Sequence, residues 1–213
     1  MVRTYIEYHD FSCTAYLMSI LSGIRQLFKS PFDHGVAHDL YVTIVRQTRL
    51  AVFYDDFGVH DTPEGRYDLL ALHTYLVLRR LREESEKTDE LAQALFDLMF
   101  ADIDQNLREM GYGDTGIAKR VRKMAEGFYG RINAYDQGLD ETGKEPETGT
   151  ASPSVLERAL DRNLYRDANP SKDVISAMAR YVRAQAAHLA DQGIDTLVTG
   201  QLTFTVPVLH GGE

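Results

Sequence analysis

Thiol chemistry is almost absent from this chain, which has one cysteine, Cys13, among 213 residues. A single cysteine excludes an intrachain disulfide and any zinc site built on several thiolates. No segment reaches the ~18 apolar residues of a membrane-spanning helix. The longest uncharged run, Phe11 to Ile24, follows Glu7 and Asp10, which do not fit the positively charged start of a secretory signal. These absences favour a reducing, cytoplasmic compartment.

Positive charge is also scarce, because 23 Lys and Arg face 32 Asp and Glu for a net charge of −9. This balance argues against general affinity for nucleic acid, and we expect no DNA partner. The exception is Lys119-Arg120-Val121-Arg122-Lys123, with four cations in five residues. Lys119, Arg120, Arg122 and Lys123 are therefore a candidate partner-binding patch. The competing interpretation is a solvated helix face, relieved by pairs such as Arg122 with Glu126.

Apolar residues recur at helical spacing through the chain, and no pair of alternating strands is evident. The pattern predicts an all-α fold, a compact irregular bundle of about six to eight helices. Thr62 and Pro63 are typical of a helix start, and Gly111 of a helix end. The expected helices run from His38 to about Phe53, Pro63 to about Glu84, Thr88 or Asp89 to Met110, Asp114 or Thr115 to about Tyr135, Pro153 to about Tyr165, and Ser171 to Gly193. A short helical turn and an extended segment should follow.

We expect three parts along the chain. Residues 1–17 are a doubtful extension without helical or strand period, because Met18 is as sensible a start as Met1. Residues 18–35 form an amphipathic helix. Residues 36–213 form a single helical domain, interrupted at 138–152 by a flexible connector, GLDETGKEPETGTAS, which has almost nothing apolar to bury.

The amphipathic helix that begins at Met18 has its bulky apolar residues in one stripe with cations beside it. The stripe and its neighbours are Ile20, Leu21, Ile24, Arg25, Leu27, Phe28 and Lys29. Such a helix can lie in a membrane interface. Docking on the protein's own core is the alternative.

The segment from Leu69 to Leu81 is apolar nearly all round, which predicts a central helix. Its polar exception, His73, is expected to be a core residue with its hydrogen bonds satisfied. A groove that accepts an apolar partner is one use for such side chains, and core burial is the other. The candidate groove residues are Leu69, Leu72, Tyr75, Leu76 and Phe100.

No catalytic or metal constellation stands out. Asp97, Asp102 and Asp104 share one predicted helix, but the Glu-x-x-His pairs of a carboxylate-bridged metal site are missing. Asp102 points nearer the apolar side than the others, so we expect it to pair with His73 or Arg79. The sequence predicts no metal, no cofactor and no enzyme.

A contiguous block resembles the ubiquinol–cytochrome c chaperone family, the assembly factors of the cytochrome bc1 complex. The resembling pieces are FYDDFGVHDTPEGRYDLLALHTYLVLRRL, AQALFDLMFADIDQNLREMGYGD and GIAKRVRKMAEGFYGRINAYD, between Phe53 and Asp136. The resemblance implies a helical, non-catalytic chaperone that binds newly made cytochrome b. The client can also be a related membrane subunit, and mitochondrial members of the family act at the ribosome's exit region with a small partner protein.

The combined expectation is a cytoplasmic assembly chaperone for cytochrome b, placed peripherally on the inner face of a bacterial cytoplasmic membrane. The main alternative is an RNA- or ribosome-binding helical protein that acts through its basic helix face. A third is an enzyme or haem carrier that uses His60, His73 or His188.

Overall fold

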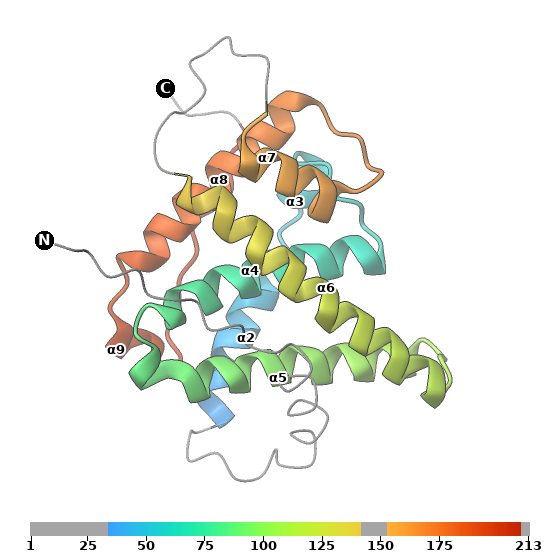
Figure 1. Ribbon diagram of the computed structural model, residues 1–213, viewed down its shortest axis with the longest axis vertical. Coiled ribbons are helices and arrows are strands. Elements are labelled where there is room, and N and C mark those ends of the chain that lie inside the picture. The colour runs from blue at the N-terminus through green and yellow to red at the C-terminus, as the bar shows by residue number, and fades with distance from the viewer. Residues whose placement is uncertain (1–33, 142–152, 210–213) are drawn as a thin grey trace, which may run out of the picture. The chain divides into compact units, whose positions relative to one another are not determined.

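The computed structural model describes residues 34–141 and 153–209. Eight α-helices and one π-helix account for most of these residues, and no strand occurs among them, as the all-α prediction requires (Figure 1). The helices are α2 (His34–Thr48), α3 (Val52–Asp55), α4 (Pro63–Arg82), α5 (Ser85–Glu109), α6 (Asp114–Asp140), α7 (Val155–Leu160), the π-helix η1 (Asp161–Tyr165), α8 (Lys172–Ala190) and α9 (Ile194–Leu197). The extension predicted at 1–17 and the amphipathic helix predicted at 18–35, apart from its last two residues, which belong to α2, lie outside the described residues. None of the described helices is long and apolar enough to span a membrane.

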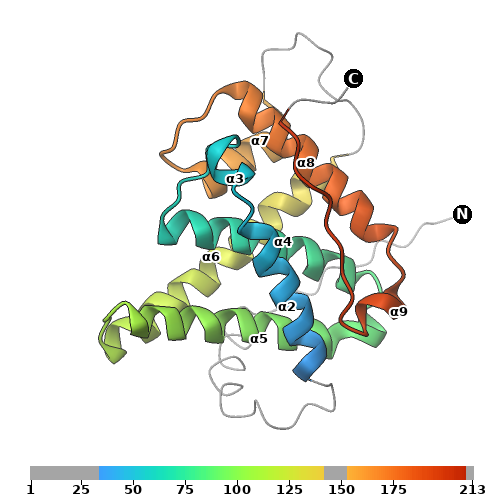
Figure 2. The same ribbon diagram turned by 180° about the vertical axis from the view of Figure 1, so that it is seen from behind.

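Helix α4 is the centre of the fold, as its apolar pattern predicts. Figures 1 and 2 show it enclosed, with α6 on one side and α2 and α8 on the other, and α5 packs on it as well. The helix begins as expected, because the Thr62 hydroxyl accepts a hydrogen bond from the Gly65 amide at 3.1 Å and Pro63 occupies the first turn.

His73 is a satisfied core residue, as expected from its position on α4. Its side chain is fully buried, and Nδ1 lies 2.9 Å from the Leu69 carbonyl. Because a carbonyl only accepts, Nδ1 carries the proton and Nε2 accepts from the Tyr181 hydroxyl at 2.8 Å. The rings of Phe53, Tyr181 and Phe204 surround the imidazole at centroid distances of 5.3 to 5.8 Å. Burial lowers the pKa of His73 to about 4.

Two helix boundaries differ from the sequence prediction. The helix expected at 38–53 is two helices, α2 and the short α3, with a turn between them. Helix α5 begins at Ser85, before the predicted caps, because Thr88 is buried inside the first turn of α5. Its hydroxyl donates to the Leu81 carbonyl at 2.5 Å, which joins the end of α4 to the start of α5.

Helix α6 extends to Asp140, so the first residues of the predicted connector at 138–152 are helical. Gly138 explains the extension, because this part of α6 packs directly on α7. A Cβ at Gly138 would lie 2.6 Å from the Cα of Leu156, so only glycine permits the contact. The composition of the connector indicated flexibility, whereas this glycine serves close helix packing. Residues 142–152 lie outside the described part.

The chain after α9 is an extended segment that lies against the helices, as expected. Two glutamines, Gln185 of α8 and Gln192 just after that helix, bind its backbone through both amide atoms. Gln192 binds Thr203, with both N–O distances at 2.9 Å. Gln185 binds Thr205, with distances of 3.2 and 3.1 Å. The two glutamine side chains therefore make the hydrogen bonds to the tail that the backbone of a neighbouring strand would make in a sheet.

Candidate functional site

The turn between α5 and α6 exposes two large apolar side chains, Met110 and Tyr112, which we call the α5–α6 tip. Met110 is 53% exposed and Tyr112 is 39% exposed. Gly111, between them, has φ +84°, a conformation that glycine adopts without strain, and it ends α5 as the sequence predicts. The Tyr112 amide donates to the Leu107 carbonyl at 3.2 Å, which fixes the turn.

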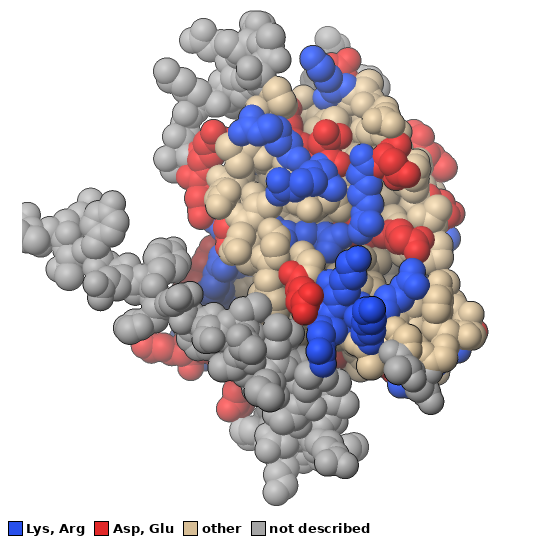
Figure 3. Space-filling view, turned by 45° about the vertical axis from the view of Figure 1, so that its right-hand side comes forward, with Lys and Arg blue, Asp and Glu red and all other residues tan. Residues whose placement is uncertain are grey.

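The cations predicted to bind a partner lie together next to this tip. Lys119, Arg120, Arg122 and Lys123 are all exposed on α6, and we call them the α6 basic face. The Arg120 guanidinium stacks over the Tyr112 ring at 4.6 Å and lies 3.8 Å from the Glu64 carboxylate. Figure 3 shows basic side chains gathered on one face of the molecule, with acidic side chains between them.

The other three cations of the α6 basic face form no ion pair with any residue that the structure describes. The relief expected from an Arg122–Glu126 pair does not form there. These ammonium and guanidinium groups are therefore hydrated and available to an anionic partner.

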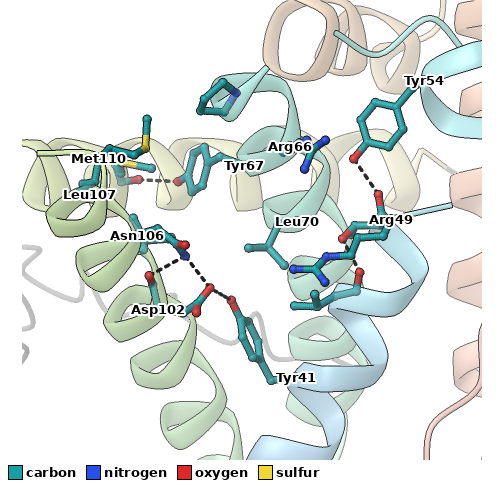
Figure 4. A pocket seen from close by; sticks show the side chains of 15 residues that line it. Tyr41, Arg49, Tyr54, Arg66, Tyr67, Leu70, Asp102, Asn106, Leu107 and Met110 are labelled. Carbon is teal, nitrogen blue, oxygen red and sulfur yellow. Dashed lines mark hydrogen bonds between the residues drawn. The ribbon is translucent and has the colours of Figure 1, made fainter. Parts of the chain in front are cut away.

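A cleft opens beside the tip and is lined by residues of α2, α3, α4, α5 and α6 (Figure 4). Its volume is about 310 Å³. Its lining is mainly apolar and aromatic, with two arginines and an aspartate among the polar members. The residues that line it are Tyr41, Val45, Thr48, Arg49, Tyr54, Pro63, Arg66, Tyr67, Leu70, Asp102, Ile103, Asn106, Leu107, Met110 and Met124. The sequence did not indicate this site.

Each of the three tyrosines of the cleft donates its hydroxyl proton in a hydrogen bond to another residue of the protein. Tyr41 donates to Asp102 at 2.8 Å, Tyr54 to the Thr48 carbonyl at 2.7 Å, and Tyr67 to the Met124 carbonyl at 3.1 Å. Burial raises the pKa of Tyr67 to about 12, and burial together with the Asp102 carboxylate raises the pKa of Tyr41 further. The tyrosines therefore present their rings to the cleft and keep their protons.

The two arginines of the cleft are differently occupied. Arg66 donates to Asp61 at 2.6 Å, and both side chains are more than half exposed. Arg49 forms no hydrogen bond or ion pair through its side chain with another described residue, although it lies close enough to influence the pKa values of Tyr41 and Tyr54. The guanidinium of Arg49 is therefore available to a ligand, whereas that of Arg66 is paired with a solvent-exposed carboxylate.

A buried ion network supports the wall of the cleft. Asp68 of α4 is fully buried and lies 2.5 Å from both Arg131 of α6 and Arg166, which follows η1. The Arg131 guanidinium also stacks on the Tyr67 ring at 5.2 Å. Helices α4 and α6 and the π-helix are thus joined through one carboxylate directly behind a cleft residue. Sequence reasoning missed this network because its members are far apart in the chain.

The predicted partner for Asp102 was wrong. Asp102 lies at the exposed mouth of the cleft and accepts from Tyr41 of α2. His73 instead faces the aromatic cluster, and Arg79 binds Asp136 at the far side of α4. The helix pattern also placed Asp102 nearer the apolar side than Asp97 and Asp104, whereas Asp102 is exposed and the other two are partly buried.

The predicted groove side chains belong to the core in this structure. Leu69, Leu72, Tyr75 and Leu76 are at most 1% exposed, and Phe100 is 7% exposed. They fill the space between α4 and its neighbours, because α4 is covered on all sides. An open surface for an apolar partner is provided instead by the tip and the cleft.

The carboxylates and histidines of the described residues form no cluster suited to a metal ion. No three His, Cys, Asp or Glu side chains of the described residues lie close enough to hold a metal ion. Asp104 pairs with Arg108 at 2.6 Å, and Gln93 donates to Asp97 at 2.8 Å. His188 lies 3.1 Å from the Thr203 hydroxyl, and both ring nitrogens of His73 are occupied.

Comparison with known proteins gives the same family as the sequence resemblance. Residues 55–204 match the family described as ubiquinol–cytochrome c chaperone. The chain is 24% identical over 166 residues to the ubiquinol–cytochrome c reductase complex assembly factor 1 of Xenopus laevis, covering 78% of each protein. It is 25% identical to the Mus musculus protein of that name over 168 residues, 78% of this chain and 53% of the mouse protein.

A solved structure shows that the similarity extends to the fold. The crystal structure of the Cbp3 homolog from Brucella abortus superposes with a TM-score of 0.70 at 30% sequence identity. The match covers 89% of this chain and 97% of the other. The family match covers most of the described helices, from α3 to the C-terminal tail. The chain therefore belongs to the ubiquinol–cytochrome c chaperone family.

Proposed function

We propose that this protein is a non-catalytic assembly chaperone that binds newly made cytochrome b and assists assembly of the ubiquinol–cytochrome c reductase complex. Its relatives are named assembly factors of that complex, which supports the role. The observation that carries the proposal is the α5–α6 tip, where exposed Met110 and Tyr112 lie between the cleft and the α6 basic face.

This surface is suited to binding a membrane subunit that has not yet been assembled into its complex. Such a client has apolar segments that must be kept from aggregating, and charged segments that connect them. Methionine adapts to differently shaped apolar surfaces. Arg120, stacked on Tyr112, combines a flat apolar contact with a positive charge. Binding that uses both features would hold the client without chemistry.

The proposal is tested by affinity purification of the tagged full-length protein from its native cells, followed by mass spectrometry. Replacing all four residues of the α6 basic face with Gln should leave the circular dichroism spectrum and thermal unfolding unchanged but reduce recovery of cytochrome b. A matched control replaces four exposed cations on other helices with Gln, namely Arg46, Lys87, Lys172 and Arg180. Equal recovery of cytochrome b with both variants would refute the role of the α6 basic face, and recovery of metabolic enzymes alone would refute the chaperone proposal.

The alternative is an RNA- or ribosome-binding protein, which the unpaired cations of the α6 basic face favour. Phosphate contacts weaken steeply with salt because bound counterions are released. Recovery of ribosomal proteins and RNA without cytochrome b, lost at raised salt, would replace the chaperone proposal with this one.

Contact with the membrane surface is the second part of the proposal. The stripe Ile20, Leu21, Ile24, Leu27 and Phe28, with Arg25 and Lys29, would hold the protein at the inner face of the cytoplasmic membrane. Flotation with anionic lipid vesicles tests this role. Ile24→Glu should reduce flotation, whereas Gln26→Glu makes the same change of charge off the stripe and should reduce it much less. Equal flotation of the wild type and Ile24→Glu would exclude the helix as the membrane contact.

A further inference from the structure

We infer that the cleft is an anchor site for a client segment in which a large apolar side chain is followed by a carboxylate. The inference rests on the proposed chaperone function and states which chemistry in a client the protein recognises. Three observations support it: the size of the cleft, its apolar floor, and the presence of arginine donors that have no buried acceptor in the protein.

The size of the cleft favours one anchoring group. At about 310 Å³ it lies at the lower end of the range for ligand pockets and has room for about ten water molecules. A whole helix or the acyl chains of a membrane lipid would not fit. One or two side chains of a peptide would fit, with the peptide backbone remaining outside at the exposed rim.

The floor of the cleft is suited to an aromatic or long aliphatic side chain. Leu70, Ile103 and Leu107 form apolar surface between α4 and α5, and Met110 and Met124 lie where α5 and α6 meet. Met110 belongs to the exposed tip as well, so the cleft and the tip form one continuous apolar surface. A segment that lies across the tip can therefore insert a side chain into the cleft.

The polar groups of the cleft call for an anion. The hydroxyl protons of its tyrosines are committed, and Asn106 donates to Asp102 at 3.1 Å. Arg49, by contrast, offers a guanidinium that no described residue binds, and Arg66 is paired with exposed Asp61 and lies over the Tyr54 ring at 6.0 Å. Figure 4 shows these two arginines near each other on one side of the cleft, across from Asp102. A carboxylate fits the arginine side, because a guanidinium binds it through two parallel hydrogen bonds.

The charge of the surroundings supports the same choice. The α6 basic face begins beside the cleft, since Arg120 lies 3.8 Å from Glu64 and Pro63 lines the cleft. An acidic segment that leaves the cleft therefore meets further cations, whereas a basic segment would be repelled along the same path. Among the charged groups of the cleft only Asp102 opposes this, and it is already held by Tyr41 and Asn106.

Methionine methyl NMR on the full chain tests the inference directly. The chain has six methionines, of which Met110 and Met124 line the cleft, while Met99 and Met178 are fully buried elsewhere and serve as internal references. The probe is the peptide GSAAFAAAEAGS, with two variants in which its Glu is Lys or its Phe is Ala. The Phe–Glu peptide should shift the two cleft methyls and leave the reference methyls in place. Either variant peptide should bind about tenfold more weakly.

Reversing the charge of Arg49 should reverse the preference of the cleft for the Glu peptide over the Lys peptide. Arg49→Glu should weaken the Phe–Glu peptide about tenfold and improve binding of the Phe–Lys peptide. Arg46→Glu is the matched control, because Arg46 is exposed in the last turn of α2, three residues before Arg49, but does not line the cleft. The inference is overturned if the Glu and Lys peptides bind equally, if Arg46→Glu has the same effect as Arg49→Glu, or if decanoate shifts the methyls more strongly than the peptide.

The outcome is separable from that of the proposed function. If Arg49→Glu still recovers cytochrome b from cells while the peptides show no charge preference, the anchor inference fails and the chaperone proposal stands. If the peptides bind as expected but no subunit of the reductase is recovered with the wild type, the cleft serves another acidic client and the proposed function fails.

Discussion

Mild acid should destabilise this protein through one buried side chain, His73. The imidazole is enclosed by Phe53, Tyr181 and Phe204, and its neutral form is held by the Leu69 carbonyl and the Tyr181 hydroxyl. Protonation would place a charge in this cage without a carboxylate to balance it. Burial accordingly lowers the pKa of His73 from 6.5 to about 4.

The magnitude follows from the difference between the two pKa values. Because the folded-state pKa lies below the unfolded one, the stabilisation is fully present above about pH 6.5 and is lost as the pH falls towards 4. The whole difference corresponds to about 3 kcal/mol, and between about pH 7 and pH 5 the expected loss is about 2 kcal/mol. The side chain is fully buried, so solvent screening does not reduce this figure much.

Urea unfolding at about pH 7 and pH 5 measures the loss, and His73→Gln supplies the comparison. Glutamine keeps one donor and one acceptor but takes up no proton in this range. The variant should be less stable than the wild type at neutral pH, yet lose about 2 kcal/mol less on acidification. All other side chains are the same in both proteins, so the comparison isolates His73. An equal loss of stability in wild type and variant would show that His73 does not carry the pH dependence.

Two further predictions concern packing and buried charge. Gly138→Ala should lower the free energy of unfolding by about 1–3 kcal/mol, because its Cβ would lie 2.6 Å from the Cα of Leu156. Gly130→Ala, which meets nothing within 4 Å on the same helix, should instead raise it by up to about 1 kcal/mol, and a gain or neutrality at Gly138 would contradict the close contact. Asp68→Ala should cost about 3–5 kcal/mol in urea unfolding, because it leaves the buried Arg131 guanidinium without its carboxylate. Asp61→Ala, which breaks an exposed pair, should change the free energy of unfolding much less, and equal costs would show that the buried network does not stabilise the fold.

Local signals in the sequence were sufficient for most of the helices. Thr62 with Pro63 and the glycine at 111 act within one turn of chain, so their role is visible without any tertiary contact. The apolar pattern of α4 also identified its central position and the core role of His73. The same pattern could not separate a groove from a core, because both require apolar side chains at the same spacing.

The cleft could not be predicted because its residues meet only in the folded protein. Tyr41 and Asp102 are separated by 61 positions in sequence, and their contact depends on how α2 packs against α5. The buried pair of Asp68 with Arg131 spans 63 positions. Charge clustering, in contrast, is a local property, which is why the α6 basic face was visible as a candidate before its surroundings were known.

The tip and the basic face should contribute to client binding with different responses to salt. Replacing Met110 and Tyr112 with Ser removes about 1 kcal/mol of apolar burial for each half-exposed side chain, so affinity should fall about tenfold or more at every salt concentration. Neutralising the α6 basic face should weaken binding at low salt and have little effect near 1 M, where charges are screened beyond about 3 Å. Titration of the protein with purified cytochrome b in detergent at both salt concentrations separates the two contributions. The control variant replaces Val206 and Val208, two exposed apolar residues of the C-terminal tail, with Ser. Loss of the tip effect at high salt would mean that Met110 and Tyr112 act only by supporting Arg120, and that the client is recognised by charge alone.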